Sequence, residues 1–221
     1  ALVLLLGLVC GLVNGILIGY TGISGFIITL AAMMLFNGIS MGVTRGVPIY
    51  GLSPALLRFG FGQWGVVPYS FVVPVVVSLV LALILRRTLM GRHILAVGGN
   101  PNAAELYGYS QRTAIIYAHT LSGVLASIAG ILATAQLGAA LPIIGSDWLL
   151  MSFAGPVLGG TSLTGGHVSV LGTILGVILV VLIGDAIILA NVNPYWRDLT
   201  LGVIILGAAS LAIRRRLSGR T

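Results

Sequence analysis

Charged side chains are scarce in this chain, and lysine is missing altogether. Only 7% of the 221 residues are charged, whereas a soluble domain carries roughly 25%. The net charge of +7 comes from eleven arginines against four acidic residues. Without lysine there is no Walker A motif, so the chain is not expected to hydrolyse ATP itself. The arginines gather at the ends of apolar runs and form no basic face, which excludes nucleic acid as an expected partner.

Cysteine is almost absent as well. The single Cys10 lies in an apolar run and excludes an intrachain disulfide or a cysteine metal cluster. We expect it to act as a small buried apolar residue. His119 and His167 lack the spacing of metal ligands, and no Ser-His-acid set occurs at readable spacing. The sequence therefore predicts no metal site and no enzymatic chemistry in this chain.

Apolar residues are abundant: 58% of the chain is hydrophobic and the mean hydropathy is +1.14. About 20 apolar residues per helix span a hydrocarbon core, so we predict an all-α polytopic transmembrane bundle with about seven membrane segments, forming one transmembrane domain over 1–221. The runs 26–44 and 145–162 are the weakest, and a broken or re-entrant helix is the alternative for each. The apolar runs are 1–20, 26–44, 67–85, 113–136, 145–162, 167–190 and 196–213.

The arginines suggest an orientation. Arginine-rich segments stay on the cytoplasmic side, and two such clusters are present: Arg86, Arg87, Arg92 and Arg112 in a polar island, and Arg214, Arg215, Arg216 and Arg220 in the tail. Four apolar runs lie between the clusters. If each run crosses the membrane once, the even number of crossings places both clusters on the cytoplasmic side. Arg45, Arg58 and Arg197 then fall outside. This orientation requires every weak run between the two clusters to cross the membrane.

Glycines recur at helical spacing in two runs. A four-residue repeat places its members on nearly one stripe, where a second helix can approach closely. We predict tight helix packing there, with a surface that slides during transport as the alternative. The residues are Gly7, Gly11, Gly15 and Gly19 in the first run and Gly172 and Gly176 in the sixth.

The polar island 86–112 contains the pattern of a short helix at about 100–108. Asn100 is a good N-cap, Pro101 fits the first turn, and Gly108 can adopt the left-handed stop. Two turns alone are unstable in water, so this helix needs a surface to rest on. A solvated connector with an incidental turn is the alternative. His93, earlier in the island, is expected to face water or a partner.

At this point the chain resembles a known family. GRHILAVGGNPNAAELYGYS in the island, together with GGTSLTGGHVSVLGTILG downstream, is similar to permease subunits of bacterial ATP-binding-cassette (ABC) importers, in the branch for ribose, xylose and autoinducer-2. The resemblance covers the last two-thirds of such a permease, so helices before Ala1 are expected to be missing. The chain departs from the family pattern at 148–151 and at 20–25, so the solute is not specified.

The resemblance implies a type II importer-like fold, a bacterial inner-membrane location and a cytoplasmic C-terminus. It implies ABC ATPase subunits carrying the ATP and Mg, a second permease copy or a sister permease, a periplasmic solute-binding protein, and lipid around the helices. The island helix would be the coupling element that the ATPase moves. Its expected coupling residues are Gly98, Gly99, Asn100, Ala103, Ala104, Glu105 and Gly108.

The remaining polar residues in apolar runs are candidates for the translocation pathway, because amides and acids can bind sugar hydroxyls. These are Asn14, Asn37, Gln136 and Asp185. Amides also link helices to one another, and a position near an outer headgroup is the alternative for Asp185. Candidate contacts for the binding protein are Arg58, Arg197 and Asp198. Two other readings stay open: a nucleoside or branched-chain amino-acid permease, and an ATP-independent channel or structural membrane subunit.

Overall fold

The computed structural model describes residues 1–146, 148–162 and 165–190, with positions 196, 199, 202, 203 and 207. They belong to two compact units, Ala1–Ser146 and Asp147–Thr221, each described by itself. The first unit contains α1 (Leu2–Thr21), α2 (Gly25–Thr44), α3 (Pro54–Phe61), β1 (Gln63–Trp64), β2 (Val67–Pro68), α4 (Tyr69–Arg87), α5 (Leu89–Gly99), α6 (Pro101–Leu106) and α7 (Gln111–Leu137). The second contains α8 (Trp148–Leu158) and α9 (Val170–Leu189).

Five helices of the described residues are long and apolar enough to cross a membrane: α1, α2, α4, α7 and α9. Most of their large apolar side chains are exposed, as expected where lipid is the solvent; Leu83 on α4, for example, is 60% exposed. The predicted all-α, polytopic architecture is confirmed. The predicted total of about seven membrane segments stays a prediction, because most of the run 196–213 lies outside the described residues.

The weak run 145–162 contains only α8, which has 11 residues. At 1.5 Å per residue it measures roughly 16 Å, about half of a hydrocarbon core. By contrast, the other weak run forms α2, whose 20 residues are sufficient. Because α8 spans only about half of a hydrocarbon core, it does not support an even number of crossings between the island and the C-terminal arginines. The orientation therefore rests on the arginines of the island alone.

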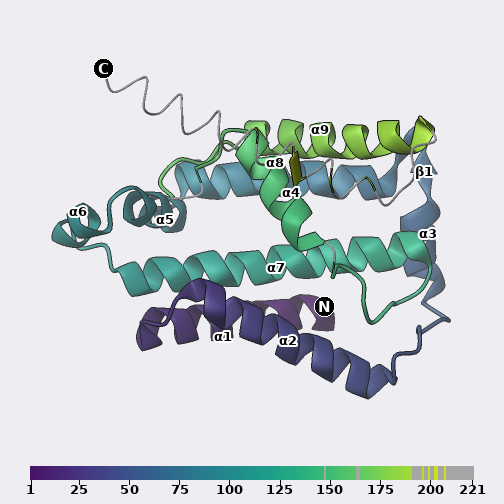
Figure 1. Cartoon of the computed structure of the whole chain (residues 1–221), viewed down its shortest axis with the longest axis horizontal. Coiled ribbons are helices and arrows are strands. Elements are labelled where there is room, and N and C mark those ends of the chain that lie inside the picture. Colours follow the sequence, from purple (N-terminus) through teal and green to yellow (C-terminus); the bar gives the residue numbers. More distant parts are fainter. Residues whose placement is uncertain are drawn as a thin grey trace. The chain divides into compact units, whose positions relative to one another are not determined.

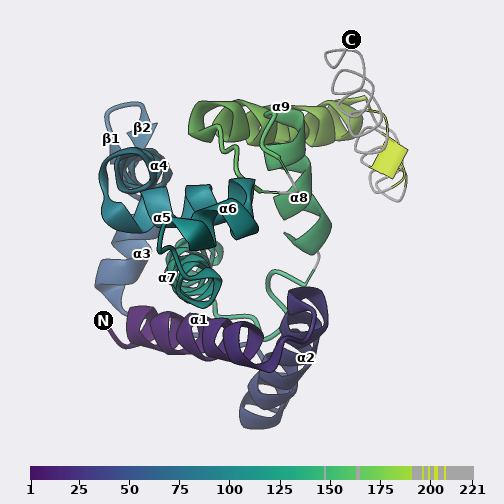
Figure 2. The same ribbon diagram turned by 90° about the vertical axis from the view of Figure 1, so that its left-hand side faces the viewer.

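Helix α1 lies antiparallel along α7 (Figure 1). The glycine stripe forms this contact: Gly7 faces Ser127, Gly11 faces His119, Gly15 faces Ile116 and Gly19 faces Arg112. Packing of this kind needs small residues, because lipid supplies no hydrophobic force between helices and close van der Waals contact must replace it. After a turn at Gly22, α2 returns and diverges from the α1–α7 pair (Figure 2).

The end of the first unit that lies opposite the island is closed by short elements. Helix α3 packs on the last turns of α7, where Gly60 meets the Ala135 carbonyl group. A β-bridge joins Ile49 to Ala140 through two backbone hydrogen bonds of 3.0 and 2.9 Å. The hairpin β1–β2 then leads into α4. The loop 45–66 is thus attached to the end of α7 that is distant from the island.

In the second unit, α8 and α9 form an antiparallel pair. The backbones touch at glycines on both helices: a Cβ on Gly172 would meet the carbonyl group of Gly159, and a Cβ on Gly176 would meet that of Gly155. Ala154 and Val180 form a small buried core beside this contact. Ser169 caps the start of α9, its hydroxyl accepting from the Gly172 N–H at 3.0 Å.

Candidate functional site

The polar island is more ordered than its sequence suggests, because a helix that was not expected, α5, fills its first half. Thr88 makes the bend from α4 to α5. Its hydroxyl donates to the Ile84 carbonyl group at 2.6 Å and accepts from the Gly91 N–H at 3.1 Å. Gly91 lies against the backbone of Leu85, and this close approach leaves no room for a side chain. Thr88 therefore caps both the end of the membrane helix α4 and the start of the short helix α5.

The short helix expected at about 100–108 is α6. Asn100 caps it, its side-chain oxygen accepting from the Ala103 N–H at 3.0 Å, and Pro101 is the first helical residue. At the other end, the Tyr109 N–H donates to the Ala104 carbonyl group at 3.0 Å, while Gly108 adopts a φ of +83°. That φ favours glycine, since a Cβ is strained in the left-handed region.

A small apolar core holds α6 to the membrane helices. Ala104 is 5% exposed and packs with Val97 of α5 and Ala114 of α7. His93 of α5 adds a polar link to the start of α7, with its Nε2 lying 2.9 Å from the Ser110 carbonyl oxygen and its ring 4.9 Å from that of Tyr109. His93 is thus half-buried and its ring contacts the start of α7; the expectation that it faces water or a partner stays a prediction.

The outer edge of α6 carries two exposed apolar side chains that sequence reasoning missed. Leu106 is 89% exposed and Tyr107 is 83% exposed, and Glu105 beside them is exposed too. Ala104, named as a coupling residue, is buried and has no surface to offer a partner. The other named coupling residues are exposed or half-buried: Gly98, Gly99, Asn100, Ala103 and Gly108. In a helix of six residues, the sequence does not show which side packs against the neighbouring helices.

Helix α6 is connected through α7 to the membrane helix α1. The Ala104 core joins it to the first turn of α7, and the glycine stripe joins α7 to α1 over most of their shared length. At the island end of this seam, the Arg112 guanidinium lies 5.4 Å from the centre of the Tyr20 ring, a cation–π distance. Helices α6, α7 and α1 are therefore joined by a continuous series of contacts.

Of the candidate pathway residues in the first unit, Asn14 lines the cavity described below, whereas Asn37 and Gln136 do not. Asn14 is half-buried on α1, Asn37 and Gln136 are exposed on α2 and at the end of α7, and Asp185 is exposed on α9 of the second unit. Arg58 is exposed on α3, at the end of the first unit that is distant from the island. Arg197 and Asp198 lie outside the described residues.

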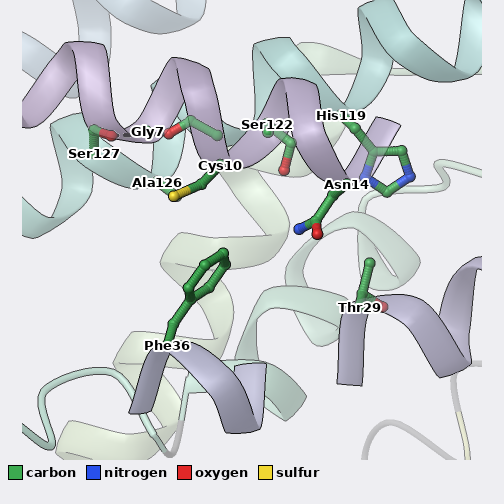
Figure 3. A pocket seen from close by; sticks show the side chains of 11 residues that line it. Gly7, Cys10, Asn14, Thr29, Phe36, His119, Ser122, Ala126 and Ser127 are labelled. Atoms are coloured by element: carbon green, nitrogen blue, oxygen red, sulfur yellow. Dashed lines mark hydrogen bonds between the residues drawn. The ribbon is translucent and has the colours of Figure 1, made fainter. Parts of the chain in front are cut away.

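Asn14 has neighbours that sequence reasoning did not select. A cavity of about 460 Å³ lies between α1, α2 and α7, and its lining includes Asn14, His119 and Ser122 (Figure 3). Cys10 also lines it and is half-buried, so its thiol is not sealed in a core. His119 and Ser122 are three residues apart on α7, a spacing that places both on one side of a helix. That spacing is the signal that could have linked them.

Comparison with known proteins gives one family and a consistent group of relatives. The family described as "Branched-chain amino acid transport system / permease component" matches residues 1–209. The D-allose transport system permease protein of Escherichia coli is 31% identical over 94% of this chain. The ribose import permease protein of Bacillus subtilis is 34% identical over 90%. The galactose/methyl galactoside import permease protein of Haemophilus influenzae is 31% identical over 93%.

This chain spans 64%, 62% and 63% of the length of those three relatives, in that order. No solved structure matches it significantly. The match to the family model extends through all five helices that are able to cross a membrane. The chain is therefore a multi-pass membrane protein that belongs to the family of branched-chain amino acid transport system permease components.

Proposed function

We propose that this chain is the membrane-spanning permease subunit of a bacterial ABC importer that carries a monosaccharide or a similar polyhydroxylated solute. The observation that supports this most strongly is the match over 90% or more of the chain to import permeases for ribose, allose and galactose. The family's description names branched-chain amino acids instead, so an amino-acid permease is the second candidate. A nucleoside permease is a third, and an ATP-independent channel belongs to another class.

Energy comes from partner ATPase subunits that bind the ATP and Mg, because this chain has no lysine for a Walker A motif. The exposed edge of α6, formed by Glu105, Leu106 and Tyr107, docks on such a subunit. Large apolar side chains exposed on a short helix suit a groove in a partner, where they would be buried. Ala104, on the other side of α6, packs against α7 and transmits a displacement of α6 to it.

The island faces the cytoplasm of the bacterial inner membrane. Arg86, Arg87, Arg92 and Arg112 all lie at the end of the first unit where α4 ends and α7 begins, and arginines favour the cytoplasmic side. Arg58 and the hairpin then lie outside, where a periplasmic binding protein delivers the solute. The C-terminal arginines are cytoplasmic as well if the remaining runs cross an even number of times. A second permease copy or a sister permease completes the assembly.

Transport by the reconstituted assembly tests the proposal. The full-length permease, its ATPase and its binding protein are placed in lipid vesicles, and uptake of D-ribose, D-allose and D-galactose is compared with that of leucine. We expect ATP-dependent uptake of at least one sugar and none of leucine. Uptake that needs no ATP would identify a channel, and uptake of leucine alone would assign the chain to amino acids.

A further inference from the structure

The lining of the cavity between α1, α2 and α7 combines apolar and small residues with several polar side chains. The cavity volume is about 460 Å³, within the range of roughly 300–1,000 Å³ typical of small-molecule sites. Figure 3 shows the side chains of Asn14 on α1 and His119 and Ser122 on α7 directed toward one space, with Thr29 and Phe36 of α2 facing them. All of these residues belong to the first unit.

Three of these polar side chains have no hydrogen-bond partner among the described residues. Within the described part of the chain, Asn14, His119 and Ser122 make no side-chain hydrogen bond. The hydroxyls of Thr29 and Ser127 donate to carbonyl groups of their own helices, at 2.9 Å to Gly25 and 2.9 Å to Gly123, and can still accept. The cavity therefore offers an amide, an imidazole and three hydroxyls in one place.

These groups lie deep in the membrane segments. Asn14 is seven residues before the end of α1, and His119 is eight residues after the start of α7. At 1.5 Å per residue, both lie about 10–12 Å from the island end of their helices. Unpaired polar groups at that depth are costly in lipid, so an acyl chain is a poor occupant and a hydrogen-bonding occupant a good one.

We propose that this cavity is a binding site for one neutral, polyhydroxylated ring. This inference rests on the proposed sugar import. The amide, imidazole and hydroxyls bind the ring hydroxyls as donors and acceptors, and the Phe36 ring covers the apolar side of the solute. Among the residues that the structure describes, no acidic residue or arginine lines the cavity. A zwitterionic amino acid would bury two charges there without a counter-charge, so the site discriminates against the amino-acid alternative.

The chain carries its own reporter for this site, because Cys10 is its single cysteine and lines the cavity. The assembled transporter in lipid is treated with N-ethylmaleimide, and modification of Cys10 is followed by mass spectrometry of its peptide. We expect slow but measurable modification, and an at least fivefold lower rate with saturating D-ribose, D-allose or D-galactose, whichever is transported. Leucine should not protect.

Two variants separate direct binding from a distant conformational effect. Asn14→Leu keeps the side-chain volume and Ser122→Ala removes one hydroxyl; each should raise the half-saturating sugar concentration for transport and for Cys10 protection by about tenfold, a shift typical of one lost hydrogen bond. Ser78→Ala on α4 lies outside the cavity and should shift neither. Co-purification of the ATPase with each variant shows that the variants still assemble.

The outcomes are distinguishable from failure of the proposed function. If sugar uptake proceeds but no transported sugar protects Cys10, the cavity is not its site, although the importer assignment stands. If Cys10 cannot be modified in any state, another segment fills the cavity and the inference is wrong. Unchanged half-saturation in both variants would overturn it too. If no sugar is taken up, the proposed function itself fails.

Discussion

The four glycines of the α1 stripe are equivalent in sequence but not in the structure, and this difference yields a sharp prediction. A Cβ on Gly15 would lie 2.8 Å from the Ile116 Cα and 3.2 Å from its carbonyl oxygen. Carbon atoms prefer about 3.5–4.0 Å, so α1 would have to move away from α7 by roughly 1 Å. On Gly19, the nearest atom would be the Arg112 carbonyl oxygen at 3.4 Å, an ordinary contact.

The expected magnitude follows from two opposing terms. Overpacking costs about 1–3 kcal/mol, and replacing glycine by alanine inside a helix returns up to ~1 kcal/mol. Gly15→Ala should therefore lower the free energy of unfolding by about 1–2 kcal/mol. For a chain of this size, that lowers Tm by roughly 2–8 °C. Gly19→Ala should leave Tm unchanged or raise it slightly, since only the propensity term applies.

The assay is the temperature at which half of the full-length permease remains monodisperse in detergent, compared between the two variants and wild type. Gly42→Ala on α2 is a second control, because a Cβ there would meet no atom within 4 Å. If Gly15→Ala and Gly19→Ala have equal Tm values, the α1–α7 contact is not as close as described, and the route from α6 through α7 to α1 loses its basis.

Three further predictions concern the island. In a Cys10→Ser background, a membrane-impermeant maleimide applied to intact cells should label Val66→Cys in the hairpin, which is 94% exposed, but not Asn102→Cys in α6; the reverse pattern would invert the topology. His93→Ala removes the 2.9 Å contact to Ser110 and the ring contact to Tyr109, worth about 1 kcal/mol together, so amide hydrogen exchange in α6 should accelerate about fivefold, whereas equal exchange would show that His93 does not hold it. Leu106→Ala should weaken ATPase binding by about 2 kcal/mol, roughly 30-fold, with Tm unchanged; Leu137→Ala at the opposite end of α7 is the control, and equal binding by both variants would contradict the docking surface.

Local signals in the sequence were sufficient for the membrane helices and for the family. Apolar runs give long helices in lipid because each must satisfy its own backbone hydrogen bonds, and five of the predicted runs correspond to α1, α2, α4, α7 and α9 within a few residues at either end. The resemblance to sugar import permeases is confirmed by relatives that match almost the whole chain. The caps of α6 depend on Asn100 and Gly108, which act within a few residues.

Features that depend on distant contacts were not accessible from the sequence. Helix α5 contains Gly91, Gly98 and Gly99, which read as helix breakers, yet Gly91 is needed where α5 turns back on α4. The burial of Ala104 follows from Val97 and Ala114 on neighbouring helices. The cavity joins residues of three helices, whose proximity no local pattern encodes.

Site-specific photo-crosslinking tests the central claim, that α6 docks on the ATPase, most directly. A photoreactive amino acid replaces Leu106 in one variant of the full-length permease and Val66 in another, and each is irradiated in the assembled complex in lipid. Both side chains are highly exposed, and α4 separates them along the chain. The account predicts an ATPase adduct from position 106 and none from position 66. An ATPase that co-purifies but crosslinks only from position 66, or from neither, would contradict it.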